Sequence, residues 1–145
     1  MFDFLKKRET VNTLQGERRF LVAAKAIVRK DEKFLILQRS ETDSYEAGGA
    51  DFPGGKIEFG EKIEEGLLRE VREESNLEVD IVRPVRTWSF MKNENTQLVG
   101  ITFLVDYKSG EVKLSWEHSA FKWLSFDEIL NGDFPEWIKK DFRLI

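Results

Sequence analysis

A helical segment with three clustered glutamates constrains this chain more than any other feature. Helical patterning runs from about Lys62 to Ser75 and follows a strong break at Pro53-Gly54-Gly55. At about 100° per residue, Glu70, Glu73 and Glu74 fall within one arc of about 100° on this helix. The sequence therefore predicts an acidic helix that presents three carboxylates together, close to a glycine-rich turn.

Two features distinguish these glutamates from an ordinary solvated charge run. Like charges at i, i+3 and i+4 repel one another by roughly 0.2–0.5 kcal/mol per pair. Glu74 also lies next to the apolar stripe of Leu67 and Val71, where an unpaired carboxylate is costly. A hard divalent cation removes both problems, because Mg²⁺ prefers oxygen ligands and retains several waters. We therefore predict a magnesium site here; a solvated helix surface is the alternative interpretation.

The residues on either side of the helix suit the same site. Gly54 and Gly55 let the backbone pass close to another group, and Gly55 offers an unhindered carbonyl oxygen to a metal. Gly60 predicts a second tight turn just before Glu61. Asn76 follows the last helical residue, where a left-handed cap is wanted, and Asn is the best choice after glycine.

Composition narrows the classes of protein that fit. A length of 145 residues predicts one domain, and the absence of cysteine excludes disulfides, thiolate zinc sites and cysteine nucleophiles. A net charge of −4 argues against a global basic field for nucleic acid. The N-terminus lacks a secretory signal, and no apolar run approaches the roughly 20 residues that span a bilayer. We expect a cytoplasmic protein with no membrane partner and no stable nucleic-acid binding.

The rest of the chain reads as short strands separated by turns. The strands are expected at Phe20 to Val28, Phe34 to Gln38, Val79 to Val85, Arg86 to Met91, Leu98 to Tyr107 and Glu111 to Leu114. A hairpin turn is expected over 29–33 and a loop over 40–51.

Two helices are expected near the C-terminus. Ser125 and Glu128 form a capping box that opens a short helix, and Asn131-Gly132 closes it. A second helix begins near 133–136. The predicted class is α+β, with residues 19–145 as a single domain and residues 1–18 as an arm of uncertain role.

The segment from Gly55 to Leu77 resembles the box of the Nudix family. That pattern is Gly, five residues, Glu, seven residues, then Arg-Glu-apolar-x-Glu-Glu-x-Gly-apolar, and this chain departs from it only at Asn76. Asn and Gly both tolerate the left-handed conformation, so the departure is conservative. Residues 51–56 also resemble the entry to the box in MutT-type members, and Glu117 resembles an extra glutamate brought to the metals by a later loop.

The resemblance implies a Nudix-type α/β/α sandwich with a mixed β-sheet and the box loop–helix beside it. The implied ligands of Mg²⁺, or of Mn²⁺ as a substitute, are Glu70, Glu73, Glu74 and the carbonyl of Gly55. Arg69 would hold a neighbouring box glutamate, and its alternative is a simple surface ion pair. Glu61 would anchor the loop–helix junction, and its alternative is a favourable charge at a helix N-terminus.

The implied reaction is attack of an activated water on a phosphorus of a nucleoside diphosphate derivative. Candidate substrates are a nucleoside triphosphate, an ADP-sugar or a dinucleoside polyphosphate. Glu70 and Glu117 are both open as the general base, and for Glu117 the alternative is a loop charge with no role. Arg39 and Lys56 are expected to bind substrate, and for Arg39 the alternative is a solvated strand end. Dimers are common in this family, so a homodimer is one expected assembly.

The remaining candidates are weaker. Trp88, Phe90, Tyr45 and Trp116 could stack a nucleobase, although aromatics in strands more often belong to the core. His118, the only histidine, is expected to be inert. The alternative function is a noncatalytic nucleotide sensor on the same fold, but the retention of all four box glutamates favours the enzyme. An isopentenyl diphosphate isomerase of this fold needs a cysteine, which this chain lacks.

Overall fold

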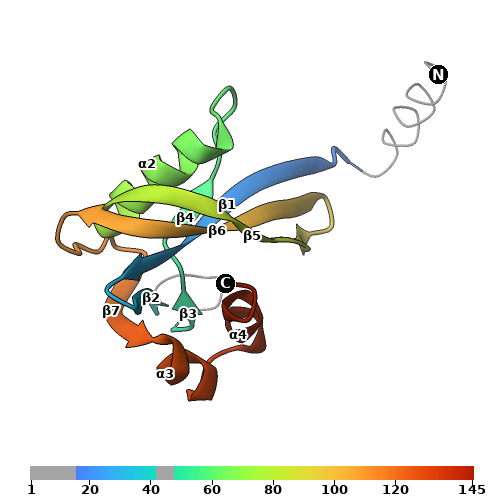
Figure 1. Cartoon of the computed structure of the whole chain (residues 1–145). Helices are drawn as coiled ribbons and strands as arrows, with labels where there is room; N and C mark the ends of the chain where they lie inside the picture. The colour runs from blue at the N-terminus through green and yellow to red at the C-terminus, as the bar shows by residue number, and fades with distance from the viewer. Residues whose placement is uncertain (1–15, 42–47) are drawn as a thin grey trace.

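A mixed β-sheet with helices on both faces forms the described part of the chain (Figure 1). The computed structural model describes residues 16–41 and 48–145. Its strands are β1 (Arg19–Lys30), β2 (Lys33–Arg39), β3 (Ala50–Asp51), β4 (Gly54–Lys56), β5 (Glu78–Asn93), β6 (Thr96–Ser109) and β7 (His118–Ser125). Its helices are α2 (Ile63–Ser75), α3 (Phe126–Asn131) and α4 (Glu136–Phe142).

The sheet is organised around β1. The strand order is β3-β2-β1-β6-β5, with β4 added to β1 and β7 added to β2. β1 and β6 run parallel, whereas the other pairs are antiparallel, so the sheet is mixed as predicted. The predicted β1–β2 hairpin is confirmed. Its turn residues Asp31 and Glu32 have φ values of 49° and 63°, which matches the twist that two-residue hairpins require.

Alternate residues of β1 face the two helical layers, because side chains alternate across a strand. Ala24, Ala26 and Val28 join Leu67 and Val71 of α2 in one buried cluster. On the opposite face, Ile27 joins a second cluster that α3 and α4 cover with Ile129, Ile138 and Phe142. Figure 1 shows α2 on one side of the sheet and α3 and α4 on the other. The α+β class and the three-layer sandwich are therefore confirmed.

The acidic helix forms where it was expected. α2 begins after Lys62 and ends at Ser75, and Asn76 caps it in the left-handed conformation with φ 64°. The Asn76 amide donates to Arg72 O at 2.9 Å, and its side chain donates to Glu111 O at 3.1 Å. The second predicted cap also forms, since Glu128 N donates to Ser125 Oγ at 3.2 Å.

Three strand predictions were wrong in detail. The segments 79–85 and 86–91 belong to one 16-residue strand, β5. Its register shifts on both sides of Pro84, so the strand continues through the proline. No strand forms over Glu111–Leu114. Val112 and Leu114 alternate because they pack on the α2 cluster, while the Lys113 amide donates to Ser75 O at 3.0 Å. The strand β7 was missed, and it pairs with β2 along its length.

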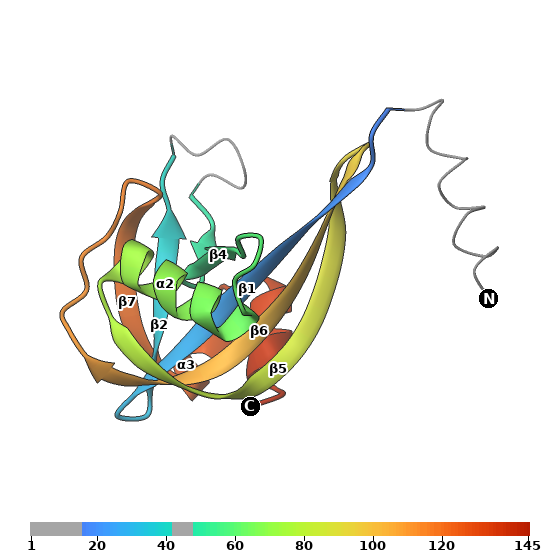
Figure 2. The same ribbon diagram turned by 90° about the horizontal axis from the view of Figure 1, so that it is seen from above.

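The ends of β1, β5 and β6 project together past the helices (Figure 2). Of the predicted N-terminal arm, only 16–18 are described, and they form no helix or strand. Tyr45 and the rest of 42–47, which is half of the predicted loop over 40–51, lie outside the described residues. Along residues 16–41 and 48–145, no helix is both long and apolar enough to cross a bilayer.

Candidate functional site

Strand β4 brings a glycine backbone against the acidic helix. A Cβ atom on Gly55 would lie 2.5 Å from Oε2 of Glu70, so only glycine leaves that carboxylate in place. Gly54 has φ 146°, and a side chain there would collide with Ala24 O at 2.1 Å. The Gly54 amide donates to Oε2 of Glu74 at 3.0 Å. Both glycines are therefore required by close approach, one to a carboxylate and one to β1.

Glu74 is the buried member of the acidic group, with 4% of its surface exposed. Burial raises the pKa of Glu74 to about 8, although Lys25 and the hydrogen bond from Gly54 oppose that rise. The side chain of Glu117 contacts Glu74 within hydrogen-bonding distance and raises its pKa further. The later loop therefore brings Glu117 to the helix.

Glu70 lies beside this pair. Burial raises the pKa of Glu70, Arg69 opposes the rise, and the charges of Glu73 and Glu117 add to it. Glu73 points toward solvent, with 57% of its side chain exposed. The structure thus groups Glu70, Glu74 and Glu117 and leaves Glu73 on the outer side of the helix.

Arg69 ties the loop to the helix. Its Nε and Nη2 donate to the two oxygens of Glu61 at 2.8 and 3.0 Å, and Nη2 also donates to Lys56 O at 3.1 Å. Its Nη1 donates to Glu70 at 3.0 Å and to Glu73 at 3.3 Å. The hydrogen bond from Arg69 lowers the pKa of Glu61 to about 2, with help from the Glu58 amide. Arg69 therefore contacts both ends of the predicted motif at once.

The donor chemistry of this group fits a hard divalent cation. Carboxylates and a glycine carbonyl supply oxygen ligands only, and a cation would favour the charged form of Glu74, whose pKa is raised by burial. Across residues 16–41 and 48–145, however, no three acidic or histidine side chains converge into a ready-made metal cage. Two of the predicted ligands, Glu70 and Glu73, form ion pairs with Arg69.

A second, buried network lies behind the carboxylates and was not predicted. Asp51 accepts hydrogen bonds at Oδ2 from Lys25 Nζ at 3.3 Å and from Arg39 Nη1 at 2.9 Å, and His118 Nε2 lies 3.0 Å from the same oxygen. Burial alone would raise the pKa of Asp51, but Lys25, His118 and Arg39 outweigh it and hold that pKa below its usual range. Lys25 also acts on Glu74, which links the network to the acidic group.

Arg39 and His118 are therefore both more buried than the sequence suggested. Arg39 is not a solvated strand end, since its side chain is 18% exposed and engaged with Asp51. His118 is not a loose loop residue, since its side chain is 1% exposed. A lysine in the apolar run of β1 was the signal for this network, because buried charges need partners.

The opposite face of the sheet carries the aromatic candidates. Lys56, Ala23, Gly100 and Trp88 form one cross-strand row from β4 to β5. The Trp88 ring lies on Gly100, where a Cβ would be 2.1 Å from the ring, and its Nε1 donates to Thr102 Oγ1 at 3.1 Å. Phe90 stacks on Trp88 with 5.9 Å between centroids. Trp116 is 75% exposed, in the turn before Glu117.

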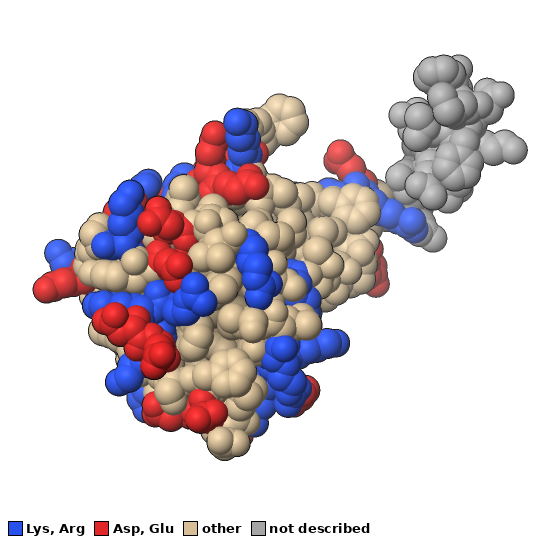
Figure 3. Space-filling model, viewed as in Figure 1, with Lys and Arg blue, Asp and Glu red and all other residues tan. Residues whose placement is uncertain are grey.

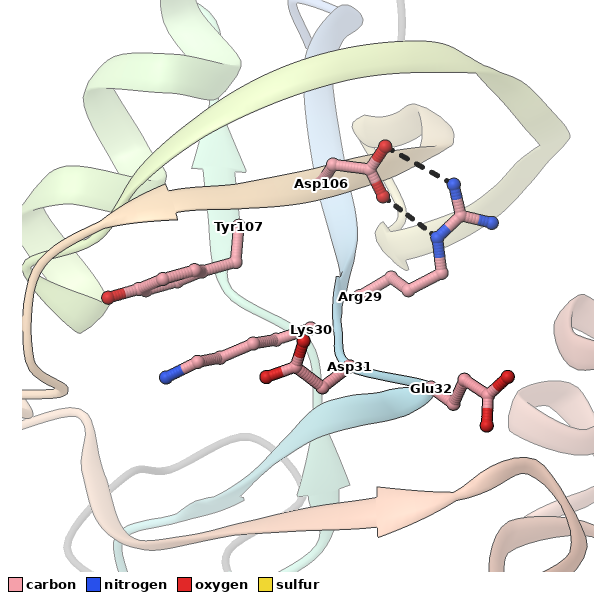
Figure 4. Close-up of a pocket in the computed structure, with 6 residues that line it drawn as sticks. All are labelled: Arg29, Lys30, Asp31, Glu32, Asp106 and Tyr107. Carbon is pink, nitrogen blue, oxygen red and sulfur yellow. Dashed lines mark hydrogen bonds and ion pairs between the residues drawn. The ribbon is translucent and has the colours of Figure 1, made fainter.

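A shallow cavity of about 570 Å³ lies elsewhere, at the β1–β2 turn (Figure 4). Its two cationic side chains already have partners. Arg29 donates to both oxygens of Asp106 at 2.8 and 3.2 Å, and Lys30 Nζ lies 4.2 Å above the Tyr107 ring. None of the predicted site residues lines it, so we do not assign the chemistry to this cavity.

Comparison with known proteins gives a consistent result. The NUDIX domain family matches residues 19–144. A solved structure of a MutT protein from Methanosarcina mazei superposes with a TM-score of 0.76 at 31% identity, and the match covers 88% of this chain and 93% of that one. This likeness agrees with the predicted Nudix-type sandwich.

Two curated relatives are longer than this chain. A NAD-capped RNA hydrolase from Mannheimia succiniciproducens is 38% identical over 115 residues, which are 77% of this chain and 41% of that protein. An ADP-ribose pyrophosphatase from Methanocaldococcus jannaschii is 31% identical over 113 residues, which are 75% of this chain and 63% of that protein. The chain thus matches less than two thirds of the length of either relative.

Proposed function

Because the chain belongs to the NUDIX domain family, we propose that it hydrolyses a phosphoanhydride bond in a nucleoside diphosphate derivative with the help of Mg²⁺. The contact of buried Glu74 with both Gly54 and Glu117 carries this proposal. The substrate classes that remain open are a nucleoside triphosphate, an ADP-sugar and a dinucleoside polyphosphate. A small nucleotide is favoured because acidic and basic side chains are intermixed over the face that Figure 3 shows, where a polynucleotide would need a basic path.

Nudix hydrolases generally need divalent metal ions, and the donors of this site suit Mg²⁺ with Mn²⁺ as a substitute. Glu70, Glu73, Glu74 and the carbonyl of Gly55 would hold the ion. When bound, such an ion supplies Lewis-acid chemistry, because it acidifies water and neutralises charge on phosphate oxygens. Exposed Glu73 would turn from Arg69 to reach it.

The other residues have distinct proposed roles. Arg69 is a positioning residue, since it holds Glu70 and Glu61 in one hydrogen-bonded unit. Glu70 and Glu117 are the two candidates for the general base, and both lie beside Glu74. Burial raises the pKa of Glu70 toward neutral pH. A general base works best when its pKa lies near the pH of the reaction. Lys56 and Arg39 would contact substrate phosphates.

Replacement of Glu74 tests the metal assignment. We expect Glu74→Gln to abolish Mg²⁺-dependent hydrolysis while circular dichroism shows an intact fold. Glu78→Gln is the matched control, because Glu78 pairs with Arg72 on the surface. Turnover in Glu74→Gln equal to that of the control would contradict the assignment.

The base is tested separately. A positioned general base contributes about 10²–10⁴ in kcat, so a loss below about tenfold in Glu117→Gln would exclude Glu117 and leave Glu70. A panel of nucleotides in ¹⁸O-labelled water, with products read by mass, identifies both the substrate and the attacked phosphorus. Nucleotide binding without turnover anywhere in the panel would favour the sensor instead.

A further inference from the structure

Ser40, the first residue after β2, makes two hydrogen bonds to the loop that carries Glu117. Its amide donates to Glu117 O at 2.8 Å, and its hydroxyl donates to Trp116 O at 2.6 Å. We call these two hydrogen bonds the Ser40 clasp. Ser40 itself is buried, with 9% of its surface exposed. Because the clasp holds two consecutive carbonyl oxygens, it restricts the direction of the loop backbone as well as its distance from β2.

An irregularity in β7 makes the Ser40 clasp possible. The start of β7 lies beside the end of β2 (Figure 2). Arg39 pairs with His118, whereas the residue before Arg39 pairs with the second residue after His118, so Ser119 is an extra residue in the ladder. Regular pairing would place His118 opposite Ser40. The bulge instead brings Glu117 opposite Ser40, and bulges beside functional sites often redirect a side chain in this way.

The connection from β6 to β7 is held at two separate places. Near its middle, the Lys113 amide donates to Ser75 O at the end of α2 at 3.0 Å. Its last part, which carries Glu117, is a turn closed by a hydrogen bond of 3.3 Å from the His118 amide to Ser115 O. That hydrogen bond is longer than either bond of the Ser40 clasp. The clasp is therefore a strong restraint on the end of the connection.

A series of contacts leads from this turn to the acidic group. His118, at the end of the turn, lies 3.0 Å from Oδ2 of Asp51, and Lys25 Nζ donates to the same oxygen at 3.3 Å. Lys25 pairs with Gly54, whose amide donates to Oε2 of Glu74 at 3.0 Å. The position of the turn is thus linked to the position of the buried carboxylate.

We propose that Ser40 is a positioning residue, which holds the backbone of Trp116 and Glu117 so that the Glu117 carboxylate reaches the acidic group. This inference rests on the proposed function, in which Glu117 is one of two candidates for the general base. In this role Ser40 contacts no reacting atom and acts through Glu117 alone. A serine that only stabilises the end of β2 would instead lower stability without a selective loss of kcat.

The Ser40 clasp is tested first without metal and without substrate. Amide hydrogen exchange is followed by NMR in the wild type and in Ser40→Ala, which retains the amide but lacks the hydroxyl. Loss of one hydrogen bond lets the turn open more often, so protection of the amides at position 40 and at His118 should fall about threefold to tenfold. The Arg39 amide is the internal control, because it donates to Gly49 O at 2.8 Å on the other side of β2. Unchanged protection at position 40 and His118 overturns the proposal, and so does an equal fall at Arg39.

Kinetics then separate positioning from a structural role. Ser40→Ala should lower kcat about tenfold and change KM by less than about twofold, because a misplaced base is felt in the transition state. Ser40→Thr, which keeps the hydroxyl, should recover most of the loss. Ser125→Ala is the matched control: its hydroxyl accepts from Glu128 N at 3.2 Å at the other end of β7, so its loss should lower stability and leave kcat unchanged. A loss of kcat in Ser40→Ala no greater than in this control overturns the proposal.

A double variant shows whether Ser40 acts through Glu117. In a Glu117→Gln background, Ser40→Ala should lower kcat by less than about twofold more, because the carboxylate that it positions is already absent. A further loss of about tenfold overturns the proposal, and so does an unimpaired Glu117→Gln beside an impaired Ser40→Ala. If the wild type hydrolyses no nucleotide, the proposed function fails. A selective loss of exchange protection in Ser40→Ala would then still uphold the clasp, and its absence would overturn it.

Discussion

His118 and Asp51 form a buried pair, with 3.0 Å between Nε2 of the imidazole and Oδ2 of the carboxylate. They meet because β2 lies between β3 and β7, so that Leu37 faces Asp51 while Arg39 faces His118. His118 directly follows Glu117, whose side chain contacts Glu74. The pair therefore fixes the backbone next to the carboxylate that the later loop contributes.

Loss of the Asp51 charge should destabilise the fold strongly. In Asp51→Asn, Lys25 and Arg39 lose their charged partner in a buried setting, which typically costs about 3–5 kcal/mol. Urea unfolding measures this loss. Asp106→Asn is the control, because it removes a half-exposed partner of Arg29 and should cost only about 0.2–1 kcal/mol. Equal losses in the two variants would show that Asp51 does not organise its neighbours.

The same carboxylate should make stability depend on acid. The pKa of Asp51 is held below its ordinary value, so the folded state binds fewer protons there than the unfolded chain does. The stabilisation from Asp51 is then complete above about pH 4, the ordinary pKa, and is lost as the pH falls further through the folded-state pKa. Urea midpoints of the wild type and Asp51→Asn should converge below about pH 4. A constant gap down to about pH 2 would contradict this.

A methyl group on Gly55 should damage activity more than stability. The Cβ of Gly55→Ala would lie 2.5 Å from Oε2 of Glu70, and the flexible glutamate can move away at little cost. We expect kcat/KM to fall at least about tenfold, with unfolding free energy changed by less than about 1 kcal/mol. Gly60→Ala is the converse control. Its φ of +85° makes alanine cost about 1–2 kcal/mol, but its Cβ would meet nothing within 4 Å.

The ion pair between Arg86 and Asp141 should show strong coupling. Asp141 of α4 is fully buried, Arg86 Nε donates to its Oδ1, and Oδ2 has no partner among the described residues. Arg86→Met leaves this carboxylate unpaired and should cost about 3–5 kcal/mol, whereas adding Asp141→Leu should recover most of the loss. A double-mutant cycle in urea measures the coupling. Additive losses would mean that the pair does not dock α4 onto β5.

The acidic helix was predictable because its geometry is local. The spacing of Glu70, Glu73 and Glu74 determines which helix face they share, and the left-handed cap at Asn76 depends only on the chain around it. Even so, the spacing alone predicts no difference in burial among the three glutamates. The tertiary environment separates them, since β4 buries Glu74 while Glu73 remains 57% exposed.

The network around Asp51 was not predictable by the same means. In the sequence His118 belongs to a loop segment, whereas in the structure the pairing of β7 with β2 carries it to Asp51. Such contacts depend on strand register across 67 residues, which no local pattern encodes. Trp88 is a similar case, because its place over Gly100 follows from the pairing of β5 with β6.

Arg69 is a resident counterion of the acidic group. One guanidinium already occupies Glu70 and Glu73, so a metal that approaches these carboxylates meets groups with a resident counterion. If these carboxylates bind a metal as proposed, its capture would be an exchange, in which the affinity for the metal reflects the difference between two positive partners. After such an exchange the Arg69 guanidinium would still be bound to Glu61 and to Lys56 O, so the shape of the motif would be the same with either cation.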